Sequence, residues 1–268
     1  MTAIALTIAG SDPSGGAGIQ ADLKTFAAHG VFGASAITAL TVQNTRGVFG
    51  VHAVPPGFVR EQAEAVLDDL DVRAVKVGML HDVPTIEAVA AVLRARSDLS
   101  VVVDPVMVAA SGDALLEPSA VSALREALLP LADVVTPNAH ELGILTGAGR
   151  IEDVDALESE STAALALGPG AVFAKGGRLA GSGPTSVDVL ATREGAARLE
   201  AARVPIERAH GTGCTLSSAI AARLALGAAL EPAVRDAKAY VTAALLRAAE
   251  APIGSGARPL HHEPVGIA

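Results

Sequence analysis

The stretch HGTGCT, residues 210–215, contains the only cysteine of the chain and two glycines. A helical pattern, TLSSAIAARLAL, follows it, so the amides of Gly211, Thr212 and Gly213 are expected to point outward from a helix N-terminus. Such an end carries about half a positive charge and is a ready anion site. The stretch therefore predicts a site where charge on a transferring phosphoryl group would be stabilised.

Cys214, in the same stretch, allows two interpretations. A thiol at a helix N-terminus should have a lowered pKa, so that its thiolate accepts a proton from a reacting group. Free cysteines are also frequent as small buried packing residues. The spacing by itself leaves both interpretations open.

The stretch AGSDPSGGAGIQAD, residues 9–22, lies between an apolar run and a helical pattern. Its glycines allow backbone N–H groups to approach a ligand closely, although a plain tight turn has the same composition. Gly16, Gly18 and Ala21 match the dinucleotide fingerprint loosely, but that fingerprint needs an acidic residue about 20 positions later. No Asp or Glu occurs between Asp22 and Glu61, which disfavours a nicotinamide-dependent oxidoreductase.

Carboxylates and an amide follow two later apolar runs. In VVVDPVM, Asp104 ends the run, and in VVTPNAHE, Asn138 follows the run with Glu141 three residues later. An N-x-x-E pair that opens a helix can direct its oxygens to one side, which suits a hydrated Mg²⁺ holding phosphates. The same pair is also a common helix start, with Asn138 as N-cap and Glu141 at the third helical position.

Short apolar runs that alternate with helical patterns must position these residues. Strands are expected at 4–10, 34–45, 74–80, 100–108, 133–138 and 170–177, with a hairpin at 187–206. Helices are expected at 17–30, 58–70, 83–97, 117–130, 139–146, 153–168, from Gly213 onward and at 231–250. The alternation predicts an α/β fold with a central, mostly parallel sheet and helices on both faces. No linker interrupts it, so a single domain over 1–268 is expected, with a mobile flap at 178–186.

Ligands of such sheets bind outside the carboxyl ends of the strands. Polar residues lie at the ends of expected strands and should therefore meet at one edge: Ser11 and Asp12, Gln43 and Asn44, Asp104, Asn138 and Lys175. A part of this pattern is trivial, because loops are polar in any protein.

The composition excludes several classes of partner. The formal charge of −9 and an aromatic content of 2% disfavour nucleic acid and anionic membranes. No apolar run approaches the ~20 residues of a membrane span, and the N-terminal MTAIALTIAGSD has no basic region, so it is read as a first strand. A single cysteine forms no intrachain disulfide. These observations predict a cytoplasmic protein.

Taken in order, seven stretches resemble the hydroxymethylpyrimidine/phosphomethylpyrimidine kinases of thiamine biosynthesis, members of the ribokinase-like superfamily. They are TIAGSDPSGGAGIQADLKTF, ITALTVQNTRGV, KVGML, VVVDPVM, TPNAHE, KGG and HGTGCTLSSAIAA. The resemblance runs from Ile4 to His262. It implies a ribokinase-like fold and phosphorylation, with ATP and Mg²⁺, of 4-amino-5-hydroxymethyl-2-methylpyrimidine and then of its monophosphate to the diphosphate. It also implies a homodimer.

The resemblance further implies roles for residues around the pyrimidine substrate. Asp22 would lie near the hydroxymethyl group, and Gln43 would hydrogen-bond the edge of the ring. Gly10, Met79 and Val106 would line the pocket. An amide suits the position of Gln43, because it offers both a donor and an acceptor to an aminopyrimidine.

A second set would manage the phosphates and the metal. Asp104, Asn138 and Glu141 would handle Mg²⁺ and phosphates, and Lys175 would lie near the nucleotide phosphates. The amides of residues 211–214 would form the anion hole, with Cys214 at the position of the superfamily's usual catalytic aspartate. Phosphoryl transfer needs positioning and charge neutralisation more than covalent chemistry, which fits such a set.

Two alternatives share this fold. Gln43 also occurs in relatives that phosphorylate pyridoxal, so pyridoxal is a second candidate substrate. A non-catalytic pyrimidine- or pyridoxal-binding protein would keep the ring pocket and lose the metal and anion-hole residues. Because Asp104, Glu141 and the GTGC stretch are present, the sequence favours catalysis.

Overall fold

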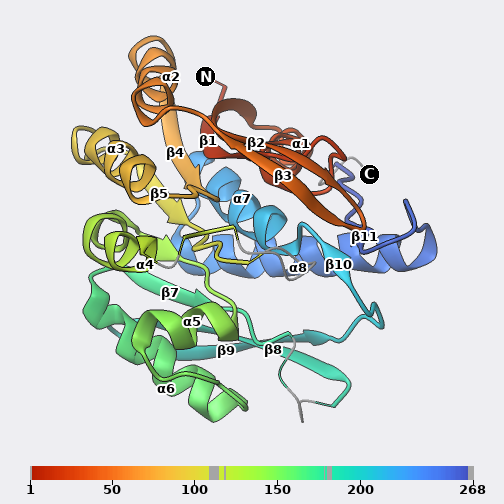
Figure 1. Ribbon diagram of the computed structural model, residues 1–268. Helices are drawn as coiled ribbons and strands as arrows, with labels where there is room; N and C mark the ends of the chain where they lie inside the picture. The colour runs from red at the N-terminus through yellow and green to blue at the C-terminus, as the bar shows by residue number, and fades with distance from the viewer. Residues whose placement is uncertain (1, 109–114, 118, 178, 180–182, 265–268) are drawn as a thin grey trace.

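The computed structural model describes residues 2–108, 115–117, 119–177, 179 and 183–264. Its centre is a nine-stranded sheet of order β3-β2-β1-β4-β5-β6-β7-β8-β9 (Figure 1). The strands are β1 (Ile4–Ser11), β2 (Phe32–Asn44), β3 (Gly47–Ala53), β4 (Val72–Val77), β5 (Ser100–Val103), β6 (Val134–Val135), β7 (Ala171–Ala174), β8 (Thr185–Thr192) and β9 (Gly195–Ala202). The neighbours β2, β1, β4, β5, β6 and β7 pair in parallel. The strands β3 at one edge and β8 and β9 at the other pair antiparallel.

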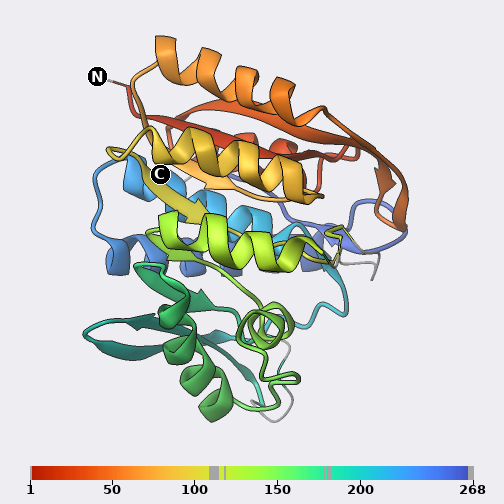
Figure 2. The same cartoon turned by 60° about the vertical axis from the view of Figure 1, so that its left-hand side comes forward.

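Helices cover both faces of the sheet, as predicted. On one face lie α1 (Gly18–Ala28), α7 (Thr212–Ala225) and α8 (Leu230–Glu250) (Figures 1 and 2). On the other face lie α2 (Pro56–Asp69), α3 (Val83–Arg94), α4 (Ala120–Ala123), α5 (Ala139–Thr146) and α6 (Val154–Ala164). The reason is the two-residue period of a strand. In β1, Leu6 and Ile8 join the core with Val59 of α2, while Ala5 joins the core with Phe26 of α1.

Several strands are shorter than the sequence predicts. β5 ends at Val103 and β6 at Val135, each just before a polar residue and a proline, which cannot donate to a ladder. The polar residues that follow therefore lie in loops at the carboxyl ends of the strands. The expected helix at 117–130 is α4 followed by a π turn over Leu124–Leu128 and a 3-10 turn over Leu129–Leu131.

The sequence analysis missed the edge strand β3. Its sequence, GVFGVHA, contains two glycines and is partly exposed throughout, so it lacks the alternation of a half-buried strand. Two short strands, β10 (Ala209–His210) and β11 (Arg258–Pro259), also escaped prediction because they pair only with each other. Residues 178 and 180–182 of the predicted flap at 178–186 lie outside the described residues, and Thr185 and Ser186 begin β8.

Among the helices that the structure describes, none is both long and apolar enough to cross a membrane.

Candidate active site

A cleft of about 1700 Å³ opens at the carboxyl ends of the parallel strands. It collects twelve of the thirteen residues that the sequence analysis selected. These are Gly10, Gln43, Met79, Asp104, Val106, Asn138, Glu141, Lys175, Gly211, Thr212, Gly213 and Cys214. They come from the carboxyl ends of β1 and β2, from the loops after β4, β5, β6 and β7, and from the starts of α5 and α7. The fold therefore brings together residues more than 200 positions apart in the chain.

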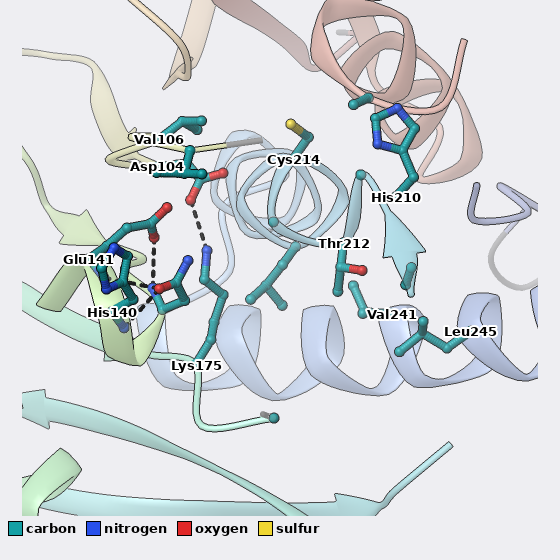
Figure 3. Close-up of a pocket in the computed structure, with 18 of the residues that line it drawn as sticks. Asp104, Val106, His140, Glu141, Lys175, His210, Thr212, Cys214, Val241 and Leu245 are labelled. Atoms are coloured by element: carbon teal, nitrogen blue, oxygen red, sulfur yellow. Dashed lines mark hydrogen bonds and ion pairs between the residues drawn. The ribbon is translucent and has the colours of Figure 1, made fainter. Parts of the chain in front are cut away.

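Asp104 and Lys175 form an ion pair on the wall of the cleft. Lys175 Nζ donates to Oδ1 of Asp104 at 2.9 Å, and Thr136 Oγ1 donates to the same oxygen at 3.2 Å (Figure 3). Although burial opposes it, Asp104 raises the pKa of Lys175 above its usual value. The Asp104–Lys175 pair lies close to the start of α7. A Cβ on Gly213 would lie 3.0 Å from Oδ2 of Asp104 and 3.2 Å from Nζ of Lys175.

Glu141 and Asn138 open α5 with a capping box. Asn138 Oδ1 accepts from the backbone N–H of His140 and of Glu141, and the backbone N–H of Asn138 donates to Glu141 Oε2 at 2.8 Å. Both residues thus have the structural role that the sequence left open, and both also line the cleft. Burial, reinforced by Asp104, raises the pKa of Glu141 to about 7 despite the opposing charge of Lys175.

The start of α7 is held against the loop after β1. Gly211, the N-cap, has a left-handed φ of 82°, and a Cβ there would overlap the carbonyl oxygen of Gly16. Only glycine allows this backbone-to-backbone contact. Gly211, Thr212 and Gly213 line the cleft, and Gly213 lies beside Asp104 and Lys175, where the predicted anion site would be.

Cys214 lies in that first turn, but its acidity differs from the prediction. Burial raises the pKa of its thiol to about 11, and the nearby Lys76 ammonium offsets only a part of that effect, while the carboxylates of Asp22 and Asp104 add to it. The expectation of a lowered pKa is wrong. Its physical reason is that desolvation of the thiolate outweighs the favourable charges around it.

Asp22 does not line the cleft, contrary to the expectation that it lies near the substrate. Its carboxylate is fully buried and accepts hydrogen bonds from Lys76 at 2.8 and 3.0 Å, from Thr7 at 2.7 Å and from Ser218 at 2.7 Å. Asp22 instead raises the pKa of Lys76, against the effect of burial. Lys76, which lines the cleft, stands at the head of the KVGML stretch, but the sequence analysis assigned it no role.

An apolar pocket with one amide forms another part of the cleft. Met79 and Val106 belong to a small apolar cluster, and Gly10 packs against Met79, with 3.1 Å from a Cβ at Gly10 to the Met79 sulfur. Gln43 lines the same cleft, and its Nε2 lies 3.2 Å from Nε2 of His210 in β10. This arrangement suits a flat, mostly apolar ring with a polar edge.

Asp12 and His210 also line the cleft. Asp12 was listed only among the polar residues at strand ends, and neither residue was assigned a role from the sequence. Nε2 of His210 lies 2.8 Å from Oδ2 of Asp12. Although burial opposes it, hydrogen bonds from His210 and Ser14 lower the pKa of Asp12 to about 2. The only sequence signals for a role in the site were their positions: Asp12 follows the first strand, and His210 is the first residue of HGTGCT.

A glycine-lined helix start, an acid–lysine pair and an apolar pocket with one amide share one cleft, an arrangement that suits a small-molecule kinase. Two solved structures share this architecture. The ADP complex of *Bacillus subtilis* pyridoxal kinase has a TM-score of 0.89 and 38% identity, covering 98% of both chains. Phosphomethylpyrimidine kinase from *Clostridium difficile* 630 has a TM-score of 0.80 and 43% identity, covering 90% of this chain and 99% of that one. The fold is ribokinase-like, as the sequence analysis expected.

The phosphomethylpyrimidine kinase family matches residues 12–261, and the chain belongs to that family. A relative from *Rhizobium meliloti* (strain 1021), hydroxymethylpyrimidine/phosphomethylpyrimidine kinase, is 54% identical over 262 residues, which cover 98% of this chain and 97% of the relative. The protein of the same name from *Escherichia coli* (strain K12) is 46% identical over 258 residues and 96% of both chains.

Proposed function

We propose that this protein phosphorylates 4-amino-5-hydroxymethyl-2-methylpyrimidine, and then its monophosphate to the diphosphate, with ATP as phosphoryl donor. The observation that carries the proposal is one cleft in which the first turn of α7, the Asp104–Lys175 pair and the Gln43 pocket face one another. The family match and the near full-length relatives named for this activity support it.

The residues have distinct roles in this proposal. Gln43, with Gly10, Met79 and Val106, holds the ring. Lys175 and the amides of residues 211–214 bind the phosphates of the nucleotide and the charge that develops on the transferring group. The hydroxymethyl oxygen forms a bond to the γ-phosphorus as the bond from that phosphorus to ADP breaks, and the hydroxyl proton passes to ionised Cys214.

The cleft also offers ligands that fit a magnesium ion. Asp104 and Glu141 supply the carboxylate oxygens that Mg²⁺ prefers. Their mutual repulsion, which adds to the effect of burial in raising the pKa of Glu141, would be relieved by a cation. No cluster of three or more His, Cys, Asp or Glu residues with metal-binding geometry occurs in the described part of the chain. An ion held by few protein ligands, with phosphates and water completing its shell, fits this set. When bound, Mg²⁺ would neutralise phosphate charge.

Pyridoxal is a second candidate substrate. The pyridoxal kinases of *Bacillus subtilis* and *Staphylococcus aureus* superpose on this chain with TM-scores of 0.89 and 0.90. Their identities of 38% and 33% are lower than those of the pyrimidine kinases, which makes pyridoxal the second choice. A non-catalytic binding protein is disfavoured, because the cleft has its anion-site glycines and its acid–lysine pair.

The test is ATP consumption by the purified protein with Mg²⁺ and each of three substrates: hydroxymethylpyrimidine, its monophosphate and pyridoxal. Turnover of both pyrimidines is expected, and omission of Mg²⁺ should abolish it. A clear preference for pyridoxal would replace the substrate and keep the mechanism. The absence of turnover with all three would contradict the proposal.

The remaining expectations about partners follow from this proposal. The partner is a small pyrimidine and not nucleic acid, which the charge of −9 disfavours. Because ATP is the donor, we place the reaction in the cytoplasm.

A further inference from the structure

Three side chains connect the loop after β1 to the ring pocket. Asp12 Oδ2 lies 2.8 Å from His210 Nε2, and the same ring nitrogen lies 3.2 Å from the side-chain amide of Gln43. All three line the cleft, with Asp12 only 2% and His210 8% exposed. The chain of contacts therefore ends on the residue that faces the ring of the substrate in the proposed function.

Asp12 is fixed as a hydrogen-bond acceptor. Its Oδ1 accepts from the backbone N–H and the hydroxyl of Ser14, and its Oδ2 accepts from the backbone N–H groups of Gly16 and Ala17. Four such donors favour an ionised carboxylate, and His210 and Ser14 lower the pKa of Asp12 to about 2 against the effect of burial. An ionised carboxylate only accepts, so the nitrogen of His210 that faces it must carry a proton.

The ring of His210 is held in place by its surroundings. A Cβ on Gly16 would overlap Cδ2 of the ring, so the ring packs directly on the backbone of the loop after β1. His210 also pairs with Pro259 in the short ladder between β10 and β11, and Gly211 packs on Gly16 just after it. Because loop, strand and helix start fix the ring together, its Nε2 stays between Asp12 and Gln43.

The orientation of the Gln43 amide follows from this geometry. An Nε2–H of His210 cannot accept from the NH₂ group of Gln43, so two donors would face each other. Rotation of the amide by half a turn places its carbonyl oxygen toward His210, where it accepts a share of that proton, and leaves the NH₂ group for the cleft. If Nδ1 of His210 also carried a proton, the same orientation of the Gln43 amide would be favoured.

We infer that His210, held by Asp12, is a positioning residue that fixes the Gln43 amide so that its NH₂ group faces the ring substrate. This inference rests on the proposed function for the identity of the ring. Gln43 then acts as a hydrogen-bond donor. The site selects heteroaromatic rings that present a lone pair at this edge, such as an unprotonated ring nitrogen, over rings that present an N–H.

The first arm of the test needs no substrate. Long-range ¹H–¹⁵N correlation spectra of the free protein, with His210→Phe to assign the signals, report which ring nitrogen of His210 carries a proton. A protonated Nε2 is expected, either in the neutral ring or in the imidazolium. A neutral ring with an unprotonated Nε2 would overturn the inference, whether or not the protein proves to be a kinase.

The second arm is a double-mutant cycle of His210→Phe and Gln43→Ala, read as KM for whichever ring substrate the wild type turns over. His210→Phe keeps a flat ring and removes the donor. It should raise this KM about tenfold, the worth of roughly one hydrogen bond, with kcat and the KM for ATP within about twofold. In the Gln43→Ala background, the same substitution should have no further effect.

Equal effects of His210→Phe in both backgrounds, or a comparable rise in the KM for ATP, would show a general structural role and overturn the inference. Failure of the wild type to turn over any ring substrate would instead contradict the proposed function. The spectra would still decide the orientation of the histidine proton. The two failures are therefore distinguishable.

Discussion

Cys214 has a position suited to catalysis and an acidity suited to a packed thiol. It lies in the first turn of α7 on the wall of the cleft, where anionic groups are stabilised. Burial nevertheless raises its pKa to about 11, and Lys76 offsets this only in part. Ionised Cys214 is therefore a minor form at neutral pH, but a strong base when it forms.

This acidity gives a prediction for Cys214→Ala. If the thiolate takes the proton of the hydroxymethyl group, the variant loses about 10²-fold in kcat with little change in substrate KM. In the wild type, kcat/KM should rise with pH from neutral toward about 11, whereas the variant should lack that rise. Steady-state kinetics over pH measure both. If the variant keeps wild-type turnover, Cys214 does not accept the proton, and the backbone amides alone stabilise the transferring phosphoryl group.

Glu141 gives a second prediction at the same scale. Because its pKa in the folded protein, about 7, exceeds its ordinary 4.5, the folded state binds the proton more tightly than the unfolded chain. The wild type should lose stability relative to Glu141→Gln as pH rises from 4.5 to about 7, by on the order of 3 kcal/mol. Glutamine keeps an oxygen for the backbone N–H of Asn138.

Chemical denaturation of both proteins without nucleotide or metal, at about pH 5 and about pH 8, measures this difference. The unfolding free energy of Glu141→Gln, relative to that of the wild type, should be higher at about pH 8 than at about pH 5. An equal difference at both values would mean that Glu141 is already ionised in the folded protein across this range.

At the scale of elements, the site depends on how closely α7 begins against β5 and β7. The approach is set by glycines: Gly211 packs on Gly16, and Gly213 faces the Asp104–Lys175 pair. Gly213 lies inside the helix without a positive φ, so glycine is not needed there for backbone conformation. Its small size is what the site requires.

Gly213→Ala therefore separates activity from stability. Alanine favours a helix over glycine by about 1 kcal/mol, but its Cβ would lie 3.0 Å from Asp104 Oδ2, where phosphate is expected to bind. We expect kcat to fall at least about tenfold while the melting temperature stays equal or rises, as measured by kinetics and thermal unfolding. Gly57→Ala in α2 is the matched control, because a Cβ there meets nothing within 4 Å. Full activity of Gly213→Ala would show that this close approach is not needed.

At the scale of the whole molecule, one sheet runs from β3 to β9 without interruption, and helices cover both of its faces. We propose that the chain is a single domain. Thermal unfolding followed by calorimetry should then show one cooperative transition, with equal calorimetric and van't Hoff enthalpies if it is also reversible. Two resolved transitions would contradict a single domain.

The edge of this sheet gives a prediction about assembly. Leu40 and Val42 of β2 and Phe49 of β3 are exposed, with Val42 and Phe49 each 65% accessible. Exposed apolar side chains that gather on paired strands mark association surfaces. We propose that a second copy of the chain covers them. Light scattering after gel filtration should show a dimer, and Val42→Glu with Phe49→Glu should give a monomer that still unfolds cooperatively. A monomeric wild type would contradict this.

The fold class, and the cleft where most of the selected residues meet, were predictable from the sequence alone. Alternating apolar runs and helical patterns predicted the parallel sheet with helices on both faces. Residues just after the strands were predicted to meet, and Gln43, Asp104, Asn138 and Lys175 do so. This succeeded because the direction of parallel strands places all of their carboxyl ends on one edge, whatever the details of packing.

Only the tertiary structure decided the burial and the hydrogen-bond partners of single side chains. It buried Asp22 beneath Lys76, raised the pKa of Cys214 and joined Asp12 to Gln43 through His210. The partners in each case are far apart in the chain, so no local spacing predicts them. Desolvation depends on every element packed around a group, and for that reason the position of Cys214 was predictable while its acidity was not.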